Sequence, residues 1–166
     1  MRTEFNLVVY KGIRRSATKD RVKPLTAVGV TSRLNEKQYL LFFDLDDSTP
    51  ESLHAVLDVI RKYVAVYCCV LISETSKGYH VIVVGRYPWR FQNKLWKLAE
   101  SYLDRKWVNL QRKRHKRMKC GAILRICGKY GYNDIRLLYE IPGNVCDEGL
   151  SSWVLRYKFW RSLCFA

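Results

Sequence analysis

Three acidic residues end an apolar run in the segment LFFDLDD, residues 41–47. Asp44 and Asp46 are two residues apart, so in a β-strand both side chains lie on the same face of the sheet. Two carboxylates on one face of a buried strand are costly without a counter-ion. Their oxygens suit Mg²⁺ or Mn²⁺. The spacing favours a metal site over the alternative, in which these acids only cap the following helix and turn the chain.

A second polar group follows further along the chain, in the turn Ser73-Glu74-Thr75-Ser76-Lys77-Gly78 and in His80. The turn offers a hydroxyl, a lysine and free backbone N–H groups near a glycine, which together suit a triphosphate. The structural alternative is an ordinary hairpin turn, where glycine is expected. A histidine alone in such a place is more often a hydrogen-bonded strand residue.

The elements that must position these residues form an α+β pattern. A helix is expected from Pro50, capped by Ser48 or Thr49, because Leu53, Val56, Leu57, Ile60 and Val64 give it one apolar face. The core order is strand, helix, strand, strand, helix, strand, at about 38–45, 50–64, 65–72, 79–85, 91–103 and 106–110. This is the split βαβ, ferredoxin-like or RRM-like order. Extra strands are expected at 5–10 and 25–31 on the N-terminal side, and at 122–127 and 135–141 on the C-terminal side.

That topology brings the polar residues together. The first strand of a split βαβ sheet lies between the third and the fourth, and both run antiparallel to it. The end of the first strand, with Asp44 and Asp46, therefore lies beside His80 and beside Asp104 at the start of the fourth strand. Three carboxylates at one edge can hold two metal ions roughly 4 Å apart, which stabilise the attacking and leaving oxygens of a phosphoryl displacement.

Length and charge limit the remaining choices. The 166 residues suit a single domain, with a core at about 38–141, N-terminal strands within 1–37 and a C-terminal extension at 142–166. The formal net charge of +15 favours nucleic acid as the partner. No apolar run approaches the roughly 20 residues of a membrane span, and the N-terminus shows no signal peptide. We expect a cytoplasmic protein without a membrane partner.

A basic run at residues 111–119 (QRKRHKRMK) is expected to contact a phosphate backbone, which gives affinity and salt dependence without sequence readout. The structural alternative is a solvated loop. The cations of this run are Arg112, Lys113, Arg114, Lys116, Arg117 and Lys119.

Two of these stretches, FFDLD and TSKGYHVIV, resemble the archaeo-eukaryotic primase superfamily, which includes the primase-polymerases of plasmids and viruses. Asp44 and Asp46 match its first motif. Its second motif is matched by Ser76, Lys77, Gly78 and His80. The third motif, an apolar residue followed by Asp, fits Leu103-Asp104, with Asp134 as the rival. The resemblance covers roughly residues 38–141.

The resemblance implies a metal-dependent DNA primase or polymerase that acts in DNA replication of a virus or plasmid, in the host cytoplasm. Asp44, Asp46 and Asp104 would be the catalytic residues and would bind two Mg²⁺ or Mn²⁺ ions, with nucleoside triphosphates as substrates. The residues that would bind the nucleotide are Ser76, Lys77, Gly78, His80, Arg125 and Lys129. The implied partners are single-stranded DNA or a primer-template, and a helicase or other replication proteins.

Two other functions stay open. An RRM-like nucleic-acid-binding protein without catalysis would carry the same basic surface, but it has no use for Asp44 and Asp46 together. A rolling-circle replication initiator endonuclease has a related sheet topology. That class uses two histidines flanking one apolar residue, and the second is missing from His80-Val81-Ile82.

Overall fold

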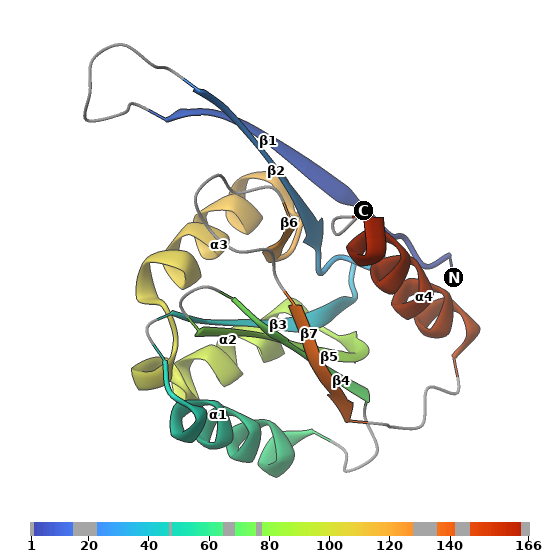
Figure 1. Ribbon diagram of the computed structural model, residues 1–166. Helices are drawn as coiled ribbons and strands as arrows, with labels where there is room; N and C mark the ends of the chain where they lie inside the picture. Colours follow the sequence, from blue (N-terminus) through green and yellow to red (C-terminus); the bar gives the residue numbers. More distant parts are fainter. Residues whose placement is uncertain are drawn as a thin grey trace.

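The computed structural model describes residues 2–14, 23–46, 48–64, 69–75, 78–127, 136–141 and 147–163, and the fold is α+β with antiparallel sheets (Figure 1). The elements are β1 (Leu7–Arg14), β2 (Lys23–Thr31), β3 (Tyr39–Asp46), α1 (Pro50–Tyr63), β4 (Cys69–Glu74), β5 (Gly78–Tyr87), α2 (Trp89–Leu98), the 3₁₀ turn η1 (Glu100–Tyr102), α3 (Arg105–Met118), β6 (Ile123–Cys127), β7 (Arg136–Ile141) and α4 (Glu148–Leu163).

The larger sheet has the strand order β3-β5-β4-β7. Both β3 and β4 pair antiparallel with β5, so they run parallel to each other and α1 connects them. α1 begins as its sequence predicts: the Thr49 side chain accepts a hydrogen bond from the Ser52 N–H, and Pro50 occupies the first turn. Its apolar face buries Leu53, Val56, Leu57 and Ile60.

The predicted fourth strand at 106–110 is wrong, because these residues begin the helix α3. The Asp104 side chain caps this helix by accepting a hydrogen bond from the Lys106 N–H at 2.9 Å. The buried face of α3 is formed by Val108, Gln111 and His115. Two of these three residues are polar, so a search for apolar periodicity misses the helix. The basic run, for which a solvated loop was the structural alternative, continues the same helix.

A separate three-stranded sheet has the order β1-β2-β6. In Figure 1 the β1–β2 hairpin extends away from the body of the molecule. β6 pairs with the end of β2, so the strand predicted at 122–127 lies in this smaller sheet.

One hydrophobic core joins the two sheets and the helices. It includes Val30 and Leu124 from the smaller sheet and Phe42 and Leu71 from the larger one. The C-terminal extension contains α4, whose Trp153 packs near Phe42 with ring centroids 6.3 Å apart. Within the described residues, no helix is long and apolar enough to span a membrane.

Candidate functional site

Asp44 and His80 are directly opposite each other on β3 and β5. Cross-strand partners share one face of the sheet, and here His80 Nε2 lies 3.4 Å from Asp44 Oδ1. Both residues are buried, with exposed fractions of 6% for His80 and 8% for Asp44. Asp44 Oδ1 is shielded from solvent and makes no hydrogen bond within the described part of the chain. A carboxylate oxygen in this state is costly, and a bound cation would compensate it.

Gly78 allows the two strands to approach closely at this end of the sheet. It pairs with Asp46, and a Cβ atom at this position would lie 1.7 Å from the Leu45 carbonyl oxygen and 2.6 Å from Ser48 Oγ. The Gly78 N–H donates to Thr75 Oγ1 at 3.0 Å, which closes the turn before β5. The close packing of β3 and β5 therefore accounts for a glycine at position 78, without any role in binding a phosphate.

Two side chains of α2 and one backbone N–H from the segment after α2 form hydrogen bonds with the outer edge of β3. Gln92 Oε1 accepts the Phe42 N–H at 2.7 Å, and Trp96 Nε1 donates to the Phe42 carbonyl at 2.8 Å. The Asp104 N–H donates to the Asp44 carbonyl at 3.0 Å. Asp104 therefore lies beside the end of β3, where the fourth strand was expected to place it, although it arrives there at the start of a helix.

The acids do not form a complete metal site within the described residues. No group of three or more His, Cys, Asp or Glu side chains is arranged there to hold a metal ion. The Asp104 carboxylate caps α3. Asp46 is exposed and has an interaction of its own. Asp44 is thus the acid whose surroundings best fit a cation, because its buried Oδ1 lacks a hydrogen bond.

The basic run at residues 111–119 forms the second half of α3 and its C-cap, and not a loop. Its exposed cations are Arg112, Lys113, Lys116, Arg117 and, as the C-cap of α3, Lys119. Arg114 is half-buried and has an interaction of its own. Cations in the last turn of a helix also interact favourably with its dipole. The helix therefore presents a basic surface of fixed geometry.

His115 does not belong to that basic surface. Its ring stacks on Trp89 with centroids 3.8 Å apart, and its Nδ1 accepts the Gly121 N–H at 3.1 Å. Burial, together with the nearby charges of Lys119 and Arg33, lowers the pKa of His115 to about 4. The ring is therefore neutral at pH 7 and attaches the end of α3 to the segment that leads into β6.

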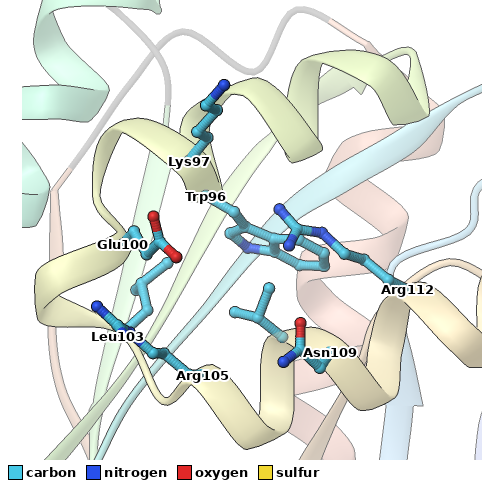
Figure 2. Close-up of a pocket in the computed structure, with 8 residues that line it drawn as sticks. Trp96, Lys97, Glu100, Leu103, Arg105, Asn109 and Arg112 are labelled. Carbon is cyan, nitrogen blue, oxygen red and sulfur yellow. The ribbon is translucent and has the colours of Figure 1, made fainter.

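A pocket of about 230 Å³ lies between α2 and the first half of α3 (Figure 2). Trp96, Leu103 and Val108 form its apolar wall and are each at most 7% exposed. Arg112 lies over the Trp96 ring, with its Cζ atom 5.9 Å from the ring centroid, and its Nε donates to Asn93 Oδ1 at 2.9 Å. The remaining lining residues are Lys97, Glu100, Arg105 and Asn109.

Several predicted residues lie elsewhere. Arg125 is in β6, opposite Gly29, and is half-buried. Ser76, Lys77, Lys129 and the rival acid Asp134 lie outside the described residues.

Lys97 and Arg105, at the pocket, were missed by the sequence analysis. Arg105, Val108, Asn109 and Arg112 follow helical spacing, so recognition of α3 would have placed them on one face.

Comparisons of this chain with protein-family models, with curated proteins and with solved structures find no match.

Proposed function

We propose that the protein is a metal-dependent nucleotidyltransferase that works on a nucleic-acid template, as a DNA primase or polymerase does. The observation that carries this proposal is the buried Asp44 carboxylate, 3.4 Å from His80, with an Oδ1 that makes no hydrogen bond within the described residues. A carboxylate oxygen buried in this way is costly unless a positive charge or a hydrogen-bond donor compensates it, and a cation bound beside His80 would do so.

The residues divide the work as follows. Asp44 and Asp46, on the same face of β3, would hold Mg²⁺ or Mn²⁺. A divalent ion bound there supplies charge stabilisation during phosphoryl transfer. His80 and the turn before β5 would hold the triphosphate of the incoming nucleotide, with Ser76, Lys77, Arg125 and Lys129 assigned to it by the resemblance alone. The exposed cations of α3 would hold the template strand. The replication setting, in a virus or plasmid with a helicase or other proteins, also follows from the resemblance alone.

A second candidate is a nucleic-acid-binding protein without catalysis. One observation favours it: the Asp104 carboxylate is engaged as the cap of α3, which leaves two acids rather than three at the end of β3. The basic surface of α3 serves this function equally well.

The deciding experiment is nucleotide incorporation on a primed single-stranded template with Mn²⁺ or Mg²⁺. An Asp44→Asn/Asp46→Asn variant keeps the side-chain shapes and removes both charges. An Asp58→Asn/Glu148→Gln variant removes two exposed acids elsewhere and serves as the matched control. We expect extension by the wild type and by the control, and none by the first variant. Template binding without extension by any of the three proteins would leave the binding protein as the better account.

A further inference from the structure

We infer that the pocket between α2 and α3 binds one nucleotide unit of a single-stranded nucleic acid, next to the proposed reaction site. The inference deepens the proposed function and rests on it for the strand's purpose, but the binding itself can be tested alone. The motifs that carry the resemblance do not include Trp96, Lys97 or Arg105, and of the pocket's lining residues only Arg112 belongs to the basic run.

The lining matches the two chemical parts of a nucleotide. The residues that line the pocket include three cations, Lys97, Arg105 and Arg112, and one acid, Glu100. Cations of this kind bind phosphate oxygens. Trp96, Leu103 and Val108 form the apolar floor of the pocket, of which only a narrow part is exposed, so it suits a sugar or the edge of a base.

Neighbouring side chains order the Arg112 guanidinium before any phosphate binds. Its position over the Trp96 ring and the hydrogen bond from its Nε to Asn93 fix the plane of the guanidinium. A guanidinium that is already ordered loses less conformational entropy when it binds. Figure 2 shows the Arg112 side chain running across the indole, while Glu100 and Asn109 face the hollow.

The size of the pocket suits one nucleotide unit rather than a larger ligand. Its volume of about 230 Å³ lies below the roughly 300–1,000 Å³ of pockets that enclose a drug-sized ligand. The hollow is recessed between two helices, so an unpaired nucleotide reaches its floor more readily than one whose base is paired within a duplex. Proteins that bind single strands combine cationic grooves with aromatic surfaces in this way.

The pocket also lies close to Asp44. Leu103 and Arg105 line the pocket, and Asp104 between them donates its N–H to the Asp44 carbonyl. A strand anchored in the pocket would therefore have its neighbouring nucleotides near the end of β3, where the proposed reaction takes place.

The test measures the affinity of the full chain for labelled oligo-dT by fluorescence anisotropy, in EDTA, over a range of salt concentrations. The variant Lys97→Ala/Arg105→Ala/Arg112→Ala removes the cations of the pocket. The control Lys37→Ala/Arg61→Ala/Lys62→Ala removes three exposed cations elsewhere. The affinity of the wild type should fall as salt is added, and each single-strand phosphate contact contributes about 0.7 to the steepness of log K against log salt. We expect the loss of three contacts in the pocket variant to make this dependence shallower by about 2. The control should change the slope little.

A second variant, Asn109→Trp, fills the pocket without changing its charge. We expect it to weaken oligo-dT binding about tenfold or more and to leave duplex binding unchanged, because the nucleotide unit loses its place in the pocket. Equal affinity of this variant and the wild type for oligo-dT, with both proteins folded by circular dichroism, would overturn the inference. So would equal losses in the two triple variants.

Free dTMP serves as the last probe. If dTMP displaces oligo-dT at concentrations near the Kd of the oligomer, the pocket takes a free nucleotide and the assignment to a strand is wrong. Because these measurements need no metal and no turnover, they are independent of the incorporation assay. A wild type that binds through the pocket but never extends a primer would refute the proposed function and leave this inference intact.

Discussion

The backbone N–H of Asp104 donates a 3.0 Å hydrogen bond to the backbone carbonyl of Asp44. This bond joins the start of α3 to the edge of β3, where a split βαβ sheet would have its fourth strand. Gln92 and Trp96 satisfy the neighbouring backbone groups of Phe42. Helical elements therefore cover an edge that would otherwise expose unpaired backbone groups. The arrangement also fixes the distance between the candidate acids and the basic helix.

Two substitutions separate the role of Asp104 as the N-cap of α3 from a role of its negative charge in metal binding. Asp104→Ala removes the cap and should lower the free energy of unfolding by about 1 kcal/mol, whereas Asp104→Asn retains a capping oxygen and should cost little. If Asp104 also binds metal, only its charge matters for activity, and the Asn variant should lose incorporation while it keeps its stability. Thermal melts and the incorporation assay on both variants decide this. An Asn variant with full activity would remove Asp104 from the candidate metal ligands.

Gly78→Ala should separate β5 from the end of β3. The added Cβ meets the backbone carbonyl of Leu45, which cannot rotate away, and overpacking of this kind costs about 1–3 kcal/mol. The matched control is Gly85→Ala in the same strand, where the nearest atoms belong to the Tyr87 side chain. Denaturant unfolding should show a larger loss for the Gly78 variant. Equal losses in the two variants would contradict the close approach described here.

Lys119→Gly should stabilise the protein. Lys119 ends α3 with a φ of 52°, in the left-handed region, where a residue with a Cβ pays roughly 1 kcal/mol more than glycine. We expect a higher melting temperature and a slightly weaker affinity for nucleic acid, because one cation is lost. Lys119→Ala is the control, since it removes the same charge but retains the strain. A rise in melting temperature for both variants would indicate that charge, rather than backbone strain, is responsible.

His115 should make stability depend on pH between about 4 and 6.5. Its pKa is about 4 in the folded protein and 6.5 in the unfolded chain, so the unfolded chain binds more protons in this interval. Stability is therefore complete above pH 6.5 and falls as the pH is lowered, by at most about 1.4 kcal/mol per pH unit from this one group.

Chemical denaturation of the wild type and of His115→Gln across this interval measures the contribution of His115. The variant should be less stable at pH 7 but should show a shallower dependence on pH, since its side chain does not titrate. Asp147 does not interfere, because its hydrogen bond with Arg86 lowers its pKa to about 2, below this interval. Parallel curves for the two proteins would contradict the burial of a neutral His115.

The sequence by itself determined the elements whose signals are local. Thr49, Pro50 and an apolar face at helical spacing predict α1, and the structure confirms its start and its buried residues. The apolar run that ends in Asp44 predicts β3, and the turn before His80 predicts the hairpin of β4 and β5. Local propensity and periodicity are sufficient for these elements because their buried faces are apolar.

Only the tertiary structure decided the identity of α3 and the partner of β6. The buried face of α3 contains Gln111 and His115, and these polar side chains become core residues because the N–H groups of Ile123 and Gly121 donate to them. Those donors come from a segment that pairs with β2 and not with β3. A pattern of apolar residues cannot predict such a helix, because its burial depends on hydrogen bonds to backbone groups that are distant in the sequence.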